Sequence, residues 1–213
     1  MIISTLILGA YENNCYILRK DENSKDCIII DTGLDVEPLM DFLREHQLNP
    51  VLLFCTHGHA DHIAGINDLR EEYPGIKVAI HKNDAKMLAS PSANLSILAG
   101  GNIAAGPADI VIESECRMNY AGMEFEVLET PGHTPGGICA YFENDAVIFV
   151  GDTLFAGSVG RTDFPGYDQQ KCFAQLICNI KEKILTLPEQ TKVYSGHGPK
   201  TSIRNEIKHN PCF

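Results

Sequence analysis

Basic residues are scarce in this chain of 213 residues, which has 17 Lys and Arg against 28 Asp and Glu and a formal net charge of −11. An acidic protein repels the phosphate backbone of nucleic acids, so we expect no nucleic-acid partner. Long apolar runs are also missing, since none approaches the roughly 20 residues that a membrane-spanning helix needs. The first ten residues are apolar but lack the basic segment of a secretory signal. We therefore expect no membrane association and a cytoplasmic location.

Paired cysteine motifs are absent as well. The chain has eight cysteines, scattered along its length, and none forms a C-x-x-C pair. Cys27, Cys55 and Cys139 lie within apolar, strand-like runs, where a thiol behaves as a small hydrophobic side chain. This pattern excludes a disulfide framework and favours a reducing compartment.

Length and hydrophobic patterning predict the fold class. A chain of 213 residues fits one domain, over residues 1–213, better than two. Strand-rich stretches occur in both halves, each with helices, which predicts an α+β fold of two mixed sheets packed face to face with helices outside. We expect strands over 2–8, 15–19, 27–30, 51–55, 77–80, 110–112, 117–120, 124–129, 137–142, 146–150 and 192–195. Helices are expected over 35–46 (with Asp35 as N-cap), 63–72, 83–89, 168–185 and 200–208, with a flexible loop over 91–106.

A histidine-rich segment follows the apolar run 51–55 at once: His57-Gly58-His59-Ala60-Asp61-His62. In a chain of this composition the pattern is expected by chance roughly 7 times in 10,000. Neutral imidazoles and carboxylates are good ligands for Zn²⁺ and similar metals. His57 and His59 are separated by one residue and can reach one ion, whereas the adjacent Asp61 and His62 fit a second ion beside it.

Three further segments place a polar side chain after a strand and next to glycine. They are Thr130-Pro131-Gly132-His133-Thr134-Pro135-Gly136, Gly151-Asp152-Thr153 and Gly196-His197-Gly198. Glycine permits a sharp turn and a close approach of the backbone. Together with the His57–His62 segment, the arrangement occurs four times. We therefore expect the four loops to converge on one rim that holds the metals.

Single histidines carry less weight. A lone histidine in a glycine-rich turn, such as His133 or His197, is more often a surface residue, and only its occurrence with the first motif favours metal ligation. His46 and His209 lie in predicted helices without such a context, so we expect them to be solvated. His81 follows a strand, but no spacing ties it to the metals. A structural zinc is the weaker alternative, because such sites are usually closed sets of four ligands rich in cysteine.

Together these motifs resemble those of the metallo-β-lactamase superfamily, and within it the short bacterial type of glyoxalase II (hydroxyacylglutathione hydrolase). The resemblance covers nearly the whole chain. It implies an αβ/βα four-layer sandwich with the site along one sheet edge. The further segments that carry it are Asn14-Cys15-Tyr16, Asp31-Thr32-Gly33, Gly151-Asp152-Thr153-Leu154-Phe155 and Gly160-Arg161-Thr162-Asp163-Phe164.

By matching position, the resemblance implies a role for each site residue. Asp31 would lie beneath the site and orient ligands. Arg161 would bind a substrate carboxylate, with a salt bridge to Asp163 as the alternative. Asp61 and Asp152 are the catalytic candidates, Asp61 by orienting or relaying a proton. The ligands would be His57, His59 and His133 at metal 1, Asp61, His62 and His197 at metal 2, and Asp152 together with a hydroxide between the two.

The implied activity is hydrolysis of S-D-lactoylglutathione or a related acyl-glutathione by the bridging hydroxide, whose pKa would fall to about 7. The thiol has a pKa of about 8.5 and can leave as thiolate, so no protein nucleophile is needed. Two divalent ions are expected, with zinc first and iron or manganese as alternatives. Longer glyoxalase II enzymes carry a C-terminal helical domain with basic residues for glutathione. This sequence ends soon after His197, so we expect glutathione binding to be built differently.

Other hypotheses stay open. The Gly-Arg-Thr-Asp run also resembles persulfide dioxygenases, which use one iron, here held by His57, His59 and His133 or Asp152. All seven dinuclear positions are filled, which disfavours this alternative. Lactam cleavage is disfavoured because Asp152 stands where one β-lactamase class has cysteine, and an acidic chain without a basic arm argues against a nuclease. A degenerate, non-enzymatic metal-binding protein is disfavoured by the complete ligand set. The sequence leaves the oligomeric state open.

Overall fold

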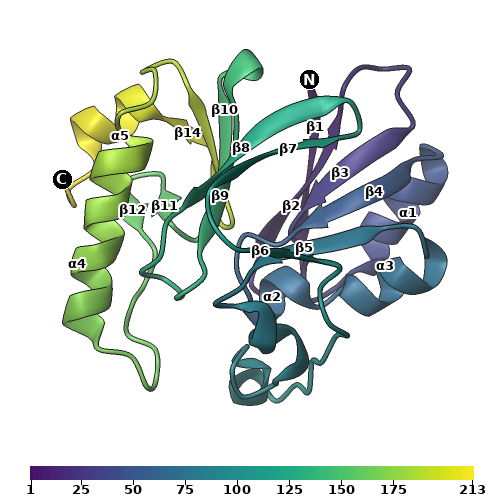
Figure 1. Ribbon diagram of the computed structural model, residues 1–213, viewed down its shortest axis with the longest axis horizontal. Helices are drawn as coiled ribbons and strands as arrows, with labels where there is room; N and C mark the ends of the chain where they lie inside the picture. The colour runs from purple at the N-terminus through teal and green to yellow at the C-terminus, as the bar shows by residue number, and fades with distance from the viewer.

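Two mixed β-sheets pack face to face, with helices on the outer face of each, in the computed structural model of this chain, which describes residues 1–213 apart from the side chain of Ala99. Helices α1 (Glu37–Glu45) and α3 (Ile66–Glu72) lie on one side of the sheets, and α4 (Gln169–Asn179) and α5 (Ile203–His209) lie on the other (Figure 1). The predicted αβ/βα sandwich is therefore confirmed.

The first sheet comes from the N-terminal half and has six strands in the order of the chain. They are β1 (Ile2–Leu8), β2 (Asn13–Arg19), β3 (Asp26–Ile30), β4 (Asn49–Phe54), β5 (Lys77–His81) and β6 (Ile110–Ile112). The pairs β1–β2 and β2–β3 are antiparallel, and the pairs from β3 through to β6 are parallel. The carboxyl ends of β3 and β4 consequently lie at the same edge of the sheet.

The second sheet also has six strands, in the order β14-β13-β10-β9-β8-β7. They are β7 (Cys116–Tyr120), β8 (Met123–Glu129), β9 (Ile138–Phe142), β10 (Val147–Gly151), β13 (Lys192–Ser195) and β14 (Thr201–Ser202). Strands β10 and β13 are parallel, and the other neighbours are antiparallel. A small hairpin, β11 (Leu154–Phe155) with β12 (Ser158–Val159), follows β10.

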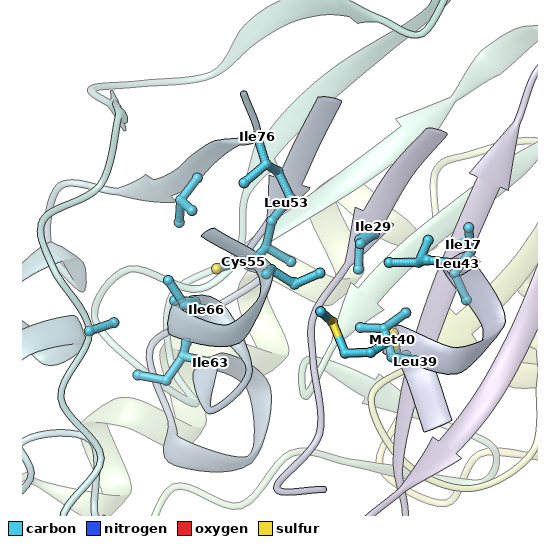
Figure 2. Close-up of a cluster of buried hydrophobic side chains, with 14 of the residues drawn as sticks. Ile17, Ile29, Leu39, Met40, Leu43, Leu53, Cys55, Ile63, Ile66 and Ile76 are labelled. Carbon is cyan, nitrogen blue, oxygen red and sulfur yellow. The ribbon is translucent and has the colours of Figure 1, made fainter. Parts of the chain in front are cut away.

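Alternation along the strands divides the core into three layers. Ile28 and Ile30 of β3 face the second sheet, whereas Ile29 between them faces the helices, as the two-residue period of a strand requires. Figure 2 shows the outer layer of the first sheet, where side chains of α1 and α3 meet those of β2, β3 and β4. A third cluster packs α4 and α5 against the second sheet.

Most predicted elements are present, but the helix boundaries differ. Helix α1 begins at Glu37, and Asp35 does not cap it, because Pro38 fixes the first turn two residues later. The predicted helix 63–72 begins three residues later, as α3 at Ile66, and a separate short helix, α2 (Ala60–Ile63), precedes it. Between the two, the Gly65 N–H donates to Thr32 Oγ1 at 3.0 Å. Helix α5 begins at Ile203, not at residue 200, because Ser202 caps it and belongs to β14.

The remaining short elements refine the predicted connections. The hairpin β11–β12 and strand β14 were not predicted, and each strand has only two residues. The predicted helix 168–185 is α4 followed by a π-helical turn. The short helical turns are η1 (Ala85–Ala89), η2 (Ser96–Ala99), η3 (Glu143–Asp145) and η4 (Ile180–Ile184). All eight cysteines are free, and Cys27, Cys55 and Cys139 are buried as predicted. Among the helices of the described residues, none is both long and apolar enough to cross a membrane.

The layer between the two sheets should dominate stability. Phe54 of β4 is fully buried there and packs edge-on against Phe125 of β8, with ring centroids 5.7 Å apart. We expect Phe54→Ala to lower the free energy of unfolding by about 3–5 kcal/mol, because it removes a large buried side chain and leaves a cavity. Phe173 of α4 is 45% exposed, and Phe173→Ala should change it by about 0.5 kcal/mol or less. Urea unfolding of both variants measures the change in the free energy of unfolding. An equal loss in the two variants would contradict the dominant role of the layer between the sheets.

Candidate metal centre

The seven predicted ligand side chains meet at one edge of the sandwich. His57 follows β4, His133 follows β8, Asp152 follows β10 and His197 follows β13. Asp61 and His62 lie in the first turn of α2, directly after the loop from β4. The structure thus brings together residues from four loops that are up to 140 positions apart along the chain, which the expected convergence requires.

Three histidines form the first cluster. His59 Nδ1 lies 3.1 Å from His57 Nε2 and 2.9 Å from His133 Nε2, and the two Nε2 atoms are 3.3 Å apart. Nitrogen atoms at about 2.0–2.1 Å from a tetrahedral zinc would be roughly 3.3–3.4 Å apart. The triangle of nitrogens is therefore slightly smaller than one face of a tetrahedral metal site and would need only a small expansion to match it.

A second cluster lies beside the first and contains Asp61, His62 and His197. Asp61 Oδ2 is 3.2 Å from His197 Nε2 and 3.6 Å from His62 Nε2. Asp152 lies between the clusters, because its Oδ2 is 3.6 Å from both His133 Nε2 and His197 Nε2. Its Oδ1 is buried and has no hydrogen-bond partner among the described residues. An unpartnered carboxylate oxygen facing a cluster of imidazoles fits a pair of divalent cations.

Hydrogen bonds fix the tautomer of four of the five rings. In each of these rings Nδ1 faces an oxygen that can accept its proton, so in the neutral ring Nδ1 carries the proton and Nε2 presents its lone pair to the site. Thr56 Oγ1 can accept from His57 because it donates its own proton to Asp31 Oδ2, at 2.6 Å. The four pairs are His57 with Thr56 Oγ1 (3.1 Å), His62 with Asp31 Oδ2 (2.9 Å), His133 with the Arg161 carbonyl (2.9 Å) and His197 with the Tyr11 carbonyl (2.9 Å).

Burial and neighbouring charge set the protonation states. Burial lowers the pKa of His57 well below its usual value, and it lowers the pKa of His59 and of His133 to about 3. These three imidazoles are neutral at physiological pH, the form that binds a metal. Burial also disfavours a charged His62, but Asp61, Asp152 and Asp31 outweigh it and raise the pKa to about 10. The carboxylates therefore favour a cation at this point, whether a proton or a metal.

Asp31 lies next to both clusters, in contact with His62 and with Thr56, the residue before His57. Its backbone is left-handed, with φ of 55°, which aspartate tolerates better than most residues. This turn directs Oδ1 to the backbone N–H of Thr56 at 2.7 Å and Oδ2 to His62 Nδ1. Asp31 thus orients one ring of the second cluster directly and, through Thr56, one ring of the first.

Sequence reasoning missed three residues that support the site. Thr56 links Asp31 to His57, and the amide nitrogen of Asn13 lies 3.1 and 3.2 Å from the two ring nitrogens of His62. Asp84 is buried and accepts hydrogen bonds from two backbone N–H groups of the metal-site loops. The only signal for Asp84 in the sequence is a carboxylate shortly after a strand, which is the same signal that marks Asp31.

Arg161 and its neighbours lie at the rim of the site. Arg161 Nε donates to Asp163 Oδ1 at 2.7 Å, which is the salt bridge considered as the alternative role. Its guanidinium also lies 4.9 Å from the centroid of the Phe164 ring. That ring packs against His59 and His133, with centroids 4.6 and 5.1 Å apart. The other predicted exclusions agree with the structure: His46 and His209 are exposed, and His81 bonds to Glu129 away from the clusters, at 2.9 Å.

Close packing around Asp152 leaves no room for a side chain at position 196, where the sequence has glycine. A Cβ atom at Gly196 would lie 2.3 Å from Asp152 Oδ1 and 2.7 Å from His62 Cε1. We expect Gly196→Ala to displace these side chains and to weaken metal binding by about 10- to 100-fold. Gly75→Ala is the matched control, because nothing lies within 4 Å of a Cβ there. Metal content after dialysis against a buffered chelator measures the effect, and unchanged binding in Gly196→Ala would count against the geometry.

Several known proteins are similar in sequence to this chain over nearly its whole length. The sequence pattern of the metallo-beta-lactamase superfamily matches residues 8–197. The probable metallo-hydrolase YqgX of Bacillus subtilis (strain 168) is 38% identical over 205 residues, which cover 96% of this chain and 93% of that protein. The hydroxyacylglutathione hydrolase GloC of Haemophilus influenzae is 34% identical over 213 residues, which cover 99% and 97%.

Solved structures agree with these relatives. A B3 metallo-beta-lactamase, BLEG-1, superposes with a TM-score of 0.91 at 38% identity, over 99% of this chain and 98% of that one. TTHA1623 in a di-iron-bound form gives 0.80 at 34% identity, over 99% and 100%. ETHE1 from Myxococcus xanthus gives 0.78 at 29% identity, over 99% and 84%. The matched sequence pattern, the relatives and the shared fold show that the chain belongs to the metallo-β-lactamase superfamily.

Proposed function

We propose that this protein is a dinuclear metallo-hydrolase that cleaves the thioester of S-D-lactoylglutathione or a related acyl-glutathione. The observation that carries the proposal is the pair of adjacent clusters that share Asp152. Metal 1 would be held by His57, His59 and His133 and metal 2 by Asp61, His62 and His197, with Asp152 available to both. The relative named hydroxyacylglutathione hydrolase GloC supports the choice of substrate.

Bound divalent cations would supply a hydroxide near neutral pH and would polarise the carbonyl oxygen of the substrate. The protein provides position and protons. Asp61 keeps a pKa below its usual value, because His62 and His197 outweigh the effect of its burial, so it stays ionised and can orient a water proton. Phe164 covers His59 and His133 from the rim and excludes water from that side. In the overall reaction water adds to the thioester carbonyl carbon and the C–S bond breaks, releasing a carboxylic acid and a thiol.

Zinc is the first choice of metal in the proposal, and iron is the main alternative. Histidine and carboxylate donors accept zinc, iron and manganese, so availability often decides. The structure of TTHA1623, whose sequence is 34% identical, was solved in a di-iron-bound form, which supports both the two-metal occupancy and the iron alternative.

Thiol release from S-D-lactoylglutathione tests the proposed activity. We expect the purified protein to hydrolyse it, and Asp152→Asn to reduce kcat/KM by at least about 100-fold, because the amide removes the shared charge. The fold should be retained, since asparagine has nearly the same volume. Asp168→Asn is the matched control: this carboxylate caps α4 through the Lys171 N–H, outside both clusters. Absence of activity towards every acyl-glutathione tried, at every metal loading, would defeat the substrate proposal.

Lactam hydrolysis is the second candidate, because the chain is 38% identical to a B3 metallo-beta-lactamase over nearly its whole length. The same donors would serve, so a β-lactam belongs in the substrate panel. Efficient lactam cleavage with inert acyl-glutathiones would favour it. The similarity to ETHE1 supports the persulfide dioxygenase alternative. About one iron per chain, together with oxygen consumption on glutathione persulfide, would favour that reading over hydrolysis.

Arg161 is the proposed partner for a substrate carboxylate. Its bond to Asp163 uses Nε, and a guanidinium has two further nitrogens that can receive a carboxylate. We expect Arg161→Ala to raise KM for S-D-lactoylglutathione by about two- to fivefold with kcat retained, because an exposed ion pair contributes up to about 1 kcal/mol. The control is Arg204→Ala, since Arg204 is equally exposed and bonds Glu189 through Nε. An unchanged KM would leave Arg161 with the salt bridge alone.

A further inference from the structure

We propose that Asp84 is the positioning residue that sets the geometry of the three-histidine cluster. The inference rests on the proposed function only in that it takes this cluster to bind metal 1. Asp84 touches none of the metal-binding side chains. It acts instead on the two loops that carry them, the loop after β4 with His57 and His59 and the loop after β8 with His133.

The carboxylate of Asp84 connects the two loops directly. Oδ2 accepts a hydrogen bond from the backbone N–H of Gly58 at 3.1 Å, and Oδ1 accepts one from the backbone N–H of Gly136 at 2.7 Å. Gly58 lies between the two histidines of the first loop, and Gly136 lies three residues after His133. One side chain therefore fixes the separation of the two segments that make the nitrogen triangle.

The surroundings of Asp84 make this connection rigid. Asp84 is fully buried, and its turn is tied to the end of β5 by the bond from its own N–H to the His81 carbonyl, at 3.0 Å. The neighbouring Asn83 donates to the Pro135 carbonyl at 3.1 Å, so the second loop is held at two points. A Cβ atom at Gly136 would lie 2.7 Å from the carboxylate carbon of Asp84. Glycine at this position is thus what allows the contact.

A carboxylate suits this place better than any other side chain. It accepts at both oxygens without offering a proton, and two N–H donors face it. In Asp84→Asn the amide nitrogen must face one of these donors, so one N–H loses its acceptor and the two loops are no longer tied to a common point. A shift of a few tenths of an ångström between His59 and His133 changes a nitrogen triangle whose edges are 2.9–3.3 Å. In the second cluster His62 and His197 have anchors of their own, because Asp31 Oδ2 holds His62 and the Tyr11 carbonyl holds His197.

Zinc titration of the metal-free full-length protein, followed by the ring ¹⁵N resonances of its histidines, tests the proposal. These resonances separate the metal 1 ligands from His62 and His197. We expect Asp84→Asn to weaken zinc binding by His57, His59 and His133 about 10- to 100-fold, with binding by His62 and His197 nearly unchanged. If Asp84→Asn does not fold, Asp84→Ser, which keeps one acceptor and is smaller, takes its place.

Glu206→Gln is the matched control for general destabilisation. Glu206 is also a fully buried carboxylate that accepts a loop N–H, from Gly157 at 3.0 Å, but it lies on α5. Both variants should lose thermal stability, and only the Asp84 variant should lose zinc at the three histidines. Wild-type zinc affinity in Asp84→Asn, or an equal loss in Glu206→Gln, would overturn the proposal. A wild-type protein that binds no zinc, iron or manganese would instead overturn the proposed function.

Discussion

The three imidazole nitrogens of His57, His59 and His133 approach one another to 2.9–3.3 Å inside the protein. The Nε2 lone pairs of His57 and His133 face each other at 3.3 Å and repel, and burial keeps both rings from taking up a second proton. A metal ion held by all three nitrogens would convert this repulsion into attraction. Other loops at this edge bring further ligands, or the carboxylates of Asp31 and Asp84 that hold the ligand loops in place.

Two buried aspartates stabilise the arrangement from different sides. Asp31, at the end of β3, orients His62 and reaches His57 through Thr56. Asp84, after β5, holds the backbone of the two loops that carry the three histidines. Both follow strands of the first sheet, so the sheet itself fixes their separation. The metal centre is therefore an extension of the first sheet to which the second sheet contributes His133, Asp152 and His197.

Most of the fold and the ligand set could be predicted from the sequence, because those signals are local and rare. The motif from His57 to His62 has few chance occurrences, and the apolar runs mark strands that are buried on both faces. Asp84, Thr56 and Asn13 could not be predicted in this way. A single Asp or Thr after a strand is common, and its role depends on which loops the register of the sheet places beside it. For Asp84 the register is set by the pairing of Phe54 in β4 with Ala79 in β5, which places the turn after β5 beside the loop after β4.

We propose that the two clusters hold two metal ions that share Asp152. Anomalous X-ray scattering from crystals of the protein, purified with its own metals, measures this directly. We expect two peaks at the edge of the sandwich, one contacted by His57 Nε2, His59 Nδ1 and His133 Nε2, and one contacted by Asp61, His62 and His197, with Asp152 touching both. A single peak under full metal loading, or peaks away from these seven side chains, would contradict the two-metal centre.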